Sequence, residues 1–328
     1  MRNVVLPDPA VRPLPFYLAL EEYVLEKMEE GDDDCFFLWQ VKPTVIFGRN
    51  QIGSREVDLD YCSSHGIDVY RRKSGGGCVF ANPDNIMMSY ITRSGDSVDG
   101  TYARYTTMIV DMLASLGIEA DASERNDILI DGRKVSGNAY YRTERGSIVH
   151  GTMLFDTDRE QMSRALTPSR RKLAAKGVSS VGSRITTLRE HTGIGIEAFK
   201  RHAVASLCDS QLRLGDADIA AVEKIAAPYF TDEWRWGFDR RAARTLPRRI
   251  EGAGEFVVDL GISPVDNTIR SLNLAGDFFV TADIDRLIVG RLRGVRADRE
   301  SVAEALRGVD VSQIISGLST NQFINLIL

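Results

Sequence analysis

The sequence contains few of the residues from which metal centres and disulfide frameworks are built. Its four cysteines and four histidines are scattered singly over 328 residues. Without a Cys-x-x-Cys pair or clustered histidines, neither a zinc site nor a disulfide framework is expected. No apolar run approaches the ~20 residues of a membrane span, and the N-terminal "MRNVVLPDPAVRPLPF" lacks the apolar core of a signal peptide. We therefore expect a soluble, cytoplasmic protein with reduced thiols and no membrane partner.

An excess of basic charge is also missing. The formal net charge is -5, whereas nucleic-acid-binding domains are usually basic, so no nucleic-acid partner is expected. Hydrophobic residues make up 43% of the chain and charged residues 27%, which is ordinary for a globular protein with a sizeable core. The length allows one large domain or two.

Hydrophobic periodicity predicts an α/β (α+β) fold, in which helices pack against a mixed sheet. An amphipathic helix is expected over residues 15–31, ending at Gly31, and a second over residues 104–118, closed by Gly117. Residues 159–214 are expected to be mainly helical. Strands are expected over residues 35–41, 44–48, 67–72, 78–91 and 147–156, with a hairpin over 126–136.

The periodic pattern lapses between Thr231 and Arg249, where arginines accumulate, and this stretch is interpreted as a connection. Strand patterns resume after it, and helices are expected from Asp283 to Leu328. About 85 residues suffice for a small α/β domain. We therefore expect two domains, residues 1–243 and 244–328.

The stretch "RRKSGGGCVF" (71–80) places three glycines directly after three cations. Glycine tolerates positive φ and lets a ligand approach the main chain, and successive amides in such a turn form an anion-binding nest. Arginine can add bidentate contacts to phosphate or carboxylate. The alternative is a surface hairpin with a solvated basic edge, and the glycines alone favour that alternative. The stretch matches neither a Walker loop nor GxGxxG.

The stretch "NDILIDGRKVSGNA" (126–139) predicts a hairpin with a type I′ turn at Asp131-Gly132. The expected register pairs Leu129 with Lys134 and Ile128 with Val135, and places Asp127 on the same face as Lys134. The two side chains then form either a cross-strand ion pair worth ~0.2–1 kcal/mol, or a metal ligand beside an anion clamp. The hairpin alone favours the ion pair.

The basic stretch "TPSRRKLAAKGVSSVGSRIT" (167–186) carries five cations, the last of them Arg184. Such a run is most often a solvated helix face. The functional alternative is a docking surface for an acidic partner.

Together and in this order, these motifs resemble the lipoate-protein ligase A family. The resemblance rests on "RRKSGGGCVFANPDN", "NDILIDGRKVSGNA", "VHGTMLF", "KLAAKGVSSVGSRITTL" and "LWQVKPTVIFGRNQ", and on "GDFF" and "GRLRGV" near the C-terminus. It departs from the family pattern at Cys78, where alanine is usual, at "ANPDN", and at Gly182, where arginine is common.

The resemblance implies a catalytic domain with the biotin/lipoate-ligase fold related to class II aminoacyl-tRNA synthetases, followed by a small α/β accessory domain. It implies a two-step ligase that converts lipoate and ATP, with Mg²⁺, to lipoyl-AMP. The lipoyl group then passes to a lysine of an apo lipoyl domain in a 2-oxoacid dehydrogenase complex or of the glycine-cleavage H protein. A monomer is expected.

The resemblance also implies roles for individual residues. Lys134 would be the catalytic ammonium between the acyl carboxylate and the α-phosphate, and Asp127 would hold Mg²⁺. His150 would border the acyl pocket, although a histidine packed inward on a strand is an equal alternative. The residues implied to bind lipoate or ATP are Arg72, Gly75, Gly76, Gly77, Cys78, Val79, Phe80, Asn85, Asn126, Lys134 and His150.

Two other functions remain open at this stage. Octanoyl and lipoyl transferases of the same superfamily use a cysteine thioester and no ATP. Their cysteine lies just before the strand that leads to the lysine, and this chain has no cysteine between Cys78 and Cys208. The second alternative is a non-catalytic binder of lipoylated partners, which would not require Lys134, Asp127, Arg72 and the triple glycine.

Overall fold

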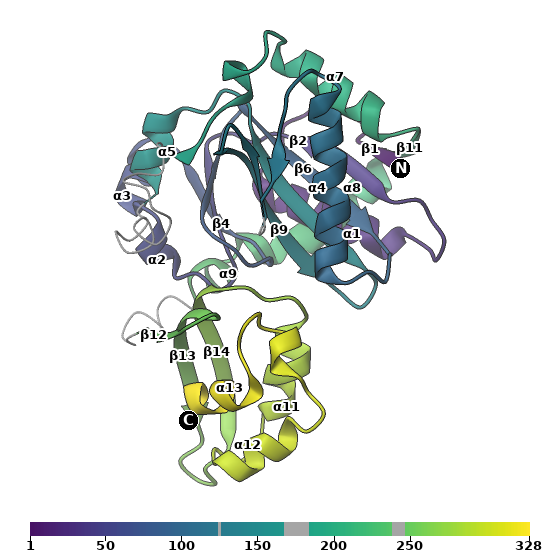
Figure 1. Ribbon diagram of the computed structural model, residues 1–328. Coiled ribbons are helices and arrows are strands. Elements are labelled where there is room, and N and C mark those ends of the chain that lie inside the picture. Colours follow the sequence, from purple (N-terminus) through teal and green to yellow (C-terminus); the bar gives the residue numbers. More distant parts are fainter. Residues whose placement is uncertain (124–125, 167–183, 238–246) are drawn as a thin grey trace.

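The structure, a computed structural model, describes residues 1–123, 126–166, 184–237 and 247–328. Figure 1 shows a larger N-terminal part and a smaller C-terminal part, each with helices packed on strands. This is the mixed α/β architecture expected from the sequence. No helix in the described ranges is long and apolar enough to cross a membrane.

The largest sheet within the described residues has eight strands in the order β11-β1-β2-β6-β10-β9-β8-β7. The pairs β11–β1 and β1–β2 are parallel, and the other pairs are antiparallel, so the sheet is mixed. Its strands are β1 (Arg2–Val5), β2 (Cys35–Trp39), β6 (Asn85–Thr92), β7 (Asp121–Ala122), β8 (Asp127–Ile130), β9 (Arg133–Arg142), β10 (Ser147–Leu154) and β11 (Ser210–Arg213).

A second sheet carries the glycine loop. It has the order β4-β3-β5, with β3 parallel to β4 and antiparallel to β5. The glycine loop connects the end of β4 to the start of β5. These strands are β3 (Thr44–Phe47), β4 (Asp68–Arg71) and β5 (Val79–Ala81).

The helices of the N-terminal part cover the sheets and their edges (Figure 1). They are α1 (Leu14–Lys27), α2 (Gly53–Glu56), α3 (Leu59–Ser64), α4 (Val98–Ala114), α5 (Arg159–Ala165), η2 (Leu188–Glu190), α7 (Ile196–Leu207), α8 (Asp216–Ala226), η3 (Ala227–Phe230) and α9 (Asp232–Trp236).

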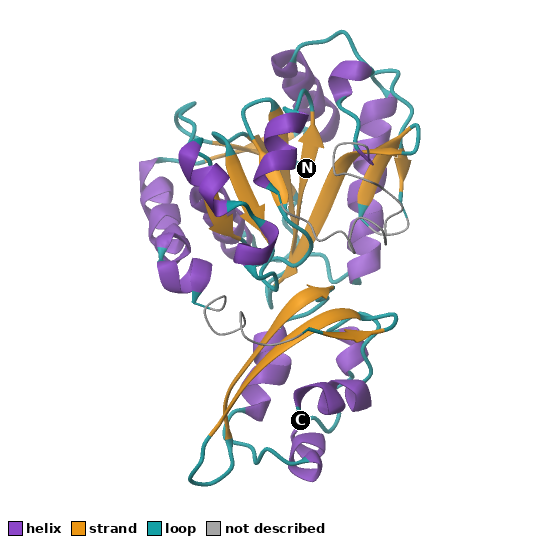
Figure 2. Ribbon diagram, turned by 90° about the vertical axis from the view of Figure 1, so that its left-hand side faces the viewer, coloured by secondary structure: helices purple, strands orange, loops and turns teal. Residues whose placement is uncertain are grey.

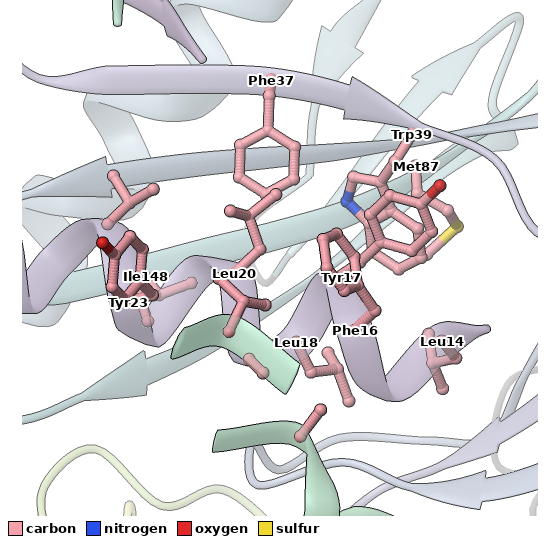
Figure 3. Packing of buried hydrophobic residues seen from close by; sticks show 14 of the residues in the cluster. Leu14, Phe16, Tyr17, Leu18, Leu20, Tyr23, Phe37, Trp39, Met87 and Ile148 are labelled. Atoms are coloured by element: carbon pink, nitrogen blue, oxygen red, sulfur yellow. The ribbon is translucent and has the colours of Figure 1, made fainter. Parts of the chain in front are cut away.

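Helix α1 packs its apolar side chains against the large sheet, as Figure 3 shows. Tyr17 stacks on Trp39 with ring centroids 4.7 Å apart, and Leu20 is fully buried. The helix ends at Lys27 rather than at Gly31, because Met28 already has an extended backbone. The charged residue Glu21 of this helix is buried as well.

The β8–β9 hairpin has the expected turn but not the full expected register. Asp131 and Gly132 have φ of 50° and 71°, as a type I′ turn requires. Leu129 pairs with Lys134, but Ile128 pairs with Ser136 instead of Val135. Val135 is the extra residue of a β-bulge, and this one-residue shift places Asp127 opposite Gly137.

Four further segments differ from the sequence-based expectations. Arg2–Val5 and Ser210–Arg213 are short parallel strands, although the second lies in a region expected to be helical. Helix α4 begins at Val98, capped by the side chain of Ser97, several residues before the expected start. The expected connection after Thr231 opens with the short helix α9.

The C-terminal part has its own antiparallel sheet, in the order β12-β13-β14, and helices packed against it (Figure 2). The expected domain boundary at residues 243/244 lies outside the described residues. The elements are β12 (Arg248–Ile250), β13 (Gly254–Ile262), β14 (Ile269–Phe278), η4 (Asp285–Val289), α11 (Gly290–Leu292), α12 (Arg299–Ala305), η5 (Val311–Gln313) and α13 (Thr320–Ile327).

The two faces of β13 serve different cores. Phe256 packs in the core of the C-terminal part, whereas its neighbour Val257 lies in a small cluster with Ile52 of the N-terminal part. The amide of Gly276 also donates to the carbonyl of Asn50 at 2.5 Å. Strand alternation therefore lets one sheet support its own helices and contact the N-terminal part.

We expect Leu20→Ala to lower the free energy of unfolding by about 2–5 kcal/mol, because it removes a fully buried side chain and leaves a cavity. Urea unfolding followed by tryptophan fluorescence measures the change. Val11→Ala is the control, since Val11 is 66% exposed and its truncation should leave the midpoint unchanged. Equal midpoints for the two variants would contradict the packing described for α1.

Candidate active site

A cavity of about 300 Å³ lies between the glycine loop, strands β9 and β10, and the C-terminal end of β14. Its lining combines apolar side chains with charged and amide groups. The apolar members include Leu14, Leu18, Trp39, Ile46, Val79, Phe80, Met87 and Leu154, and the other members include Arg72, Gly76, Gly77, Asn126, Asp127, Lys134, His150 and Arg184.

The Arg72 guanidinium holds the glycine loop through hydrogen bonds to its carbonyls and to Ser74. Nη2 donates to the carbonyls of Gly75 at 2.6 Å and Gly77 at 2.8 Å. Nη1 donates to the carbonyl of Ile46, and Nε donates to Ser74 Oγ. Burial lowers the pKa of Arg72 to about 10. In this structure the donors of Arg72 are directed largely at the loop itself.

With its carbonyls turned toward Arg72, the loop presents bare backbone to the cavity. Gly76 has φ of 87°, a conformation that favours glycine. No acceptor within the described chain is recorded for the amides of Gly76, Gly77 and Cys78. A Cβ built on Gly77 would meet nothing within 4 Å. The loop therefore has the free amides and the space that an anionic ligand requires.

Asp127 forms ion pairs with two cations of the cavity lining. Its Oδ1 lies 2.7 Å from Lys134 Nζ, and its Oδ2 accepts from Arg184 Nη2. The expected shared face of Asp127 and Lys134 is thus observed, and the two form an ion pair. Arg184, which the sequence assigned to a helix face or a docking surface, instead lines the cavity. The other four cations of that basic stretch lie outside the described residues.

Gly137 makes room for the lysine. A Cβ at this position would collide with Lys134 Nζ and lie 2.5 Å from Lys134 Cε. The Lys134 side chain therefore folds back along β9 and occupies the volume that a side chain at position 137 would fill. The glycine of "SGNA" thus determines where the ammonium lies.

His150 is the central residue of a buried hydrogen-bond chain. Its Nε2 lies 2.7 Å from Ser74 Oγ, and its Nδ1 lies 2.8 Å from Glu21 Oε2. The other oxygen of Glu21 accepts from Ser89 Oγ, which accepts from Trp39 Nε1 at 2.8 Å. Sequence reasoning missed Glu21, although its i±4 neighbours Tyr17 and Leu25 are apolar and marked its position on the buried side.

The remaining predicted residues divide into two groups. Cys78, Val79, Phe80 and Asn126 line the cavity. Asn85 and Gly75 do not belong to the described lining. Asn85 is fully buried, where its Oδ1 accepts from Thr157, and Gly75 instead directs its carbonyl to Arg72.

Burial raises the pKa of the Cys78 thiol to about 12. The thiolate is the nucleophilic form of cysteine, and a thiol with so high a pKa is almost entirely protonated near neutral pH. Cys78 is therefore poorly suited to forming an acyl thioester, although it lies on the cavity wall.

The described residues offer Mg²⁺ a single protein carboxylate at the Lys134 wall. No group of three or more His, Cys, Asp or Glu side chains in these ranges is arranged to hold a metal ion. Mg²⁺ commonly takes one or two carboxylates and completes its shell with waters and substrate phosphates. Asp127 thus fits an ion that arrives with a nucleotide, not a resident metal centre.

A lining that combines apolar side chains with cations and free amides suits a ligand with a hydrocarbon part and anionic groups. The comparison with known families agrees with this chemistry. Residues 13–208 match the model of the lipoyl protein ligase A/B catalytic domain, and residues 246–327 match that of the bacterial lipoate protein ligase C-terminus. The chain belongs to the lipoyl protein ligase A/B family.

Its relatives extend over nearly the whole chain. A lipoate–protein ligase of Streptococcus pyogenes is 32% identical over 94% of this chain and 94% of its own length. A probable lipoate-protein ligase A of Mycoplasma pneumoniae is 30% identical over 98% of this chain and 96% of its own.

Solved structures show the same fold. LipL1 of P. falciparum in complex with lipoate is 17% identical, with a TM-score of 0.74 over 99% of this chain and 97% of that one. A lipoate-protein ligase A bound with ATP is 21% identical, with a TM-score of 0.62 over 72% and 98%. A bipartite lipoate protein ligase of Thermoplasma acidophilum, described with its E2 lipoyl domain, is 23% identical, with a TM-score of 0.64 over 72% and 96%.

We expect Arg72→Lys to loosen the glycine loop, because an ammonium cannot reproduce the guanidinium fork that binds Gly75 and Gly77. Hydrogen exchange at the amides of residues 73–78 should accelerate at least about tenfold, which corresponds to losing about 1.4 kcal/mol of local stability. Arg93→Lys is the control, since Arg93 donates to the Met28 carbonyl and does not line the cavity. Unchanged exchange in the loop would show that Arg72 does not hold it.

Proposed function

We propose that this chain is an ATP-dependent lipoate-protein ligase. Its substrates are lipoate and ATP with Mg²⁺, and its acceptors are lysines of apo lipoyl domains in 2-oxoacid dehydrogenase complexes or of the glycine-cleavage H protein. The observation that carries the proposal is one cavity whose lining combines free loop amides, the Lys134 ammonium and apolar side chains. The ATP-bound and lipoate-bound relatives with the same fold support it.

In the first step, a carboxylate oxygen of lipoate attacks the α-phosphorus of ATP, and pyrophosphate leaves. Both reactants are anions, so their approach is opposed by charge repulsion. The Lys134 ammonium lowers this repulsion and stabilises the charge that develops at phosphorus. Amides of Gly76 and Gly77 donate to the phosphate oxygens, while Trp39, Met87 and Leu18 surround the acyl chain. Asp127 would hold Mg²⁺, which would supply positive charge to neutralise the phosphates.

In the second step, the ε-amine of the acceptor lysine attacks the acyl carbon of lipoyl-AMP. An amide bond forms, the acyl–phosphate bond breaks, and AMP leaves with the electron pair while the amine loses a proton. The apolar wall keeps water from the mixed anhydride, which would otherwise hydrolyse. His150 borders the cavity within the chain that links Ser74 to Glu21, and we assign it a role in holding the wall in shape.

The division into a catalytic domain over residues 1–243 and an accessory domain over residues 244–328 is part of the same proposal. The expected boundary lies between the two family matches, one of which ends at residue 208 while the other begins at residue 246. Phe278 and Phe279 from the C-terminal part line the cavity, so that part belongs to the site in this arrangement. The transferase alternative is disfavoured by the protonated Cys78.

The proposal is tested by incubating the protein with lipoate, Mg²⁺ and a purified apo lipoyl domain, with and without ATP, and measuring the intact mass of the domain. We expect a lipoyl mass gain only with ATP, and a rate at least about 10²-fold lower in Lys134→Gln. A parallel sample replaces lipoate and ATP with an octanoylated donor protein. A gain only in that sample makes the protein a transferase and overturns the proposal.

Gly137→Ala should lower kcat by about 10–100-fold without removing any charged group, because the new Cβ displaces the Lys134 ammonium. The thermal midpoint should change little, since the displaced atoms belong to the end of a flexible side chain. Gly193→Ala is the matched control, because a Cβ there would meet nothing within 4 Å. Wild-type kcat in Gly137→Ala would show that the position of the ammonium is not critical.

A further inference from the structure

Three cationic side chains in the described lining of the cavity differ in the groups that they bind. Arg72 directs Nε, Nη1 and Nη2 at acceptors of its own loop and sheet. Lys134 and Arg184 instead share one carboxylate, Asp127. Glu56 is the other carboxylate of the lining. The cations that can turn toward an incoming anion are therefore Lys134 and Arg184, since a single carboxylate neutralises only one of their two charges.

Backbone pairing fixes Arg184 beside the lysine. Ile185 forms a parallel bridge with Lys134, and the amide of Thr186 donates to the Lys134 carbonyl at 2.9 Å. The segment from Arg184 to Thr186 thus runs alongside the start of β9. Arg184 and Lys134 consequently reach opposite oxygens of the same carboxylate from neighbouring backbones.

The burial of the three groups is graded. The side chain of Asp127 is 9% exposed, that of Lys134 is 24% exposed, and that of Arg184 is 32% exposed. Of the three groups, the carboxylate is therefore the most buried and the guanidinium the most exposed. A polyphosphate entering the cavity meets the guanidinium with only part of its charge compensated. Guanidinium groups bind phosphate oxygens through two parallel N–H bonds, which suits Arg184 to this contact.

We propose that Arg184 is a phosphate-binding residue for the nucleotide, and that Asp127 holds it with Lys134 until the nucleotide's phosphates replace the carboxylate as their partner. This inference rests on the proposed function, because it presumes a nucleotide in this cavity. It divides the two cations by task. Arg184 binds the phosphate chain, which leaves the Lys134 ammonium for the reacting carboxylate and α-phosphate.

The competing role for Arg184 is a purely structural one, in which its ion pair with Asp127 fastens residues 184–186 to β9. The two roles predict different results when the ion pair is removed by replacing Asp127 instead of Arg184. A structural Arg184 loses its importance once Asp127 is replaced by asparagine. A phosphate-binding Arg184 keeps its importance, because its ligand is the nucleotide.

The experiment measures equilibrium binding of ATP by titration calorimetry in EDTA, which removes any contribution of Mg²⁺. We expect Arg184→Gln to weaken ATP binding about tenfold, or about 1.4 kcal/mol, and to leave lipoate binding within about twofold. Arg184→Lys should recover part of the loss. Arg133→Gln is the matched control. It removes one positive charge from β9, the strand beside Arg184, at a residue that pairs with Glu190 and does not line the cavity.

The decisive comparison repeats Arg184→Gln in an Asp127→Asn background. A similar loss of ATP affinity in both backgrounds supports the proposal. A loss that disappears with Asp127→Asn, or an equal loss for ATP and lipoate, overturns it in favour of the structural role. The wild-type lipoylation assay separates this outcome from a failure of the proposed function. If the wild type lipoylates with ATP and Arg184→Gln binds ATP normally, only the inference about Arg184 is wrong.

Discussion

The arrangement of the site depends on a buried guanidinium that binds neutral acceptors. Arg72 is 4% exposed, and within the described part of the chain it donates to three carbonyls and a hydroxyl and to no carboxylate. A buried charge is tolerated only when its hydrogen-bonding groups are satisfied. The glycine loop meets that demand by turning its carbonyls inward, which requires the positive φ of Gly76. A Cβ at Gly48 would collide with the Gly76 carbonyl, so the neighbouring strand end must also be bare. Because the loop turns its carbonyls toward Arg72, its amides are left free for a ligand.

The same loop is linked to the apolar core by a chain of side-chain hydrogen bonds. Ser74 accepts from Arg72 and contacts His150, and the chain continues through Glu21 and Ser89 to Trp39. Trp39 in turn stacks on Tyr17 of α1. The apolar residues Trp39 and Tyr17 and the glycine loop are therefore positioned by one buried network, and under the proposed function these are the parts that contact the acyl chain and the phosphates. A change in the packing of α1 should consequently be felt at the glycine loop, some distance along the chain.

Features set by local chemistry could be predicted from the sequence, and features set by distant partners could not. The Asp131-Gly132 turn follows from the preference of these two residues for positive φ, and the glycine loop from three consecutive glycines. The place of Arg184 depends on a bridge to Lys134, fifty residues away, so its own neighbours indicated only a basic stretch. Phe279 reaches the cavity from a different sheet, and no spacing in the sequence encodes that contact.

The β-bulge explains why an ordinary cross-strand ion pair and a catalytic ammonium need not be alternatives. In the unbulged register Val135 would face Ile128, and Asp127 would lie opposite Ser136, a residue with a side chain. The extra residue moves Asp127 opposite Gly137 instead, and Lys134 uses the vacant volume to reach the carboxylate. The ion pair then holds the ammonium over bare backbone at the edge of the cavity. Under the proposed function a phosphate takes the place of Asp127 as the partner of the lysine, so the contact that stabilises the hairpin also prepares its charge for an anionic substrate.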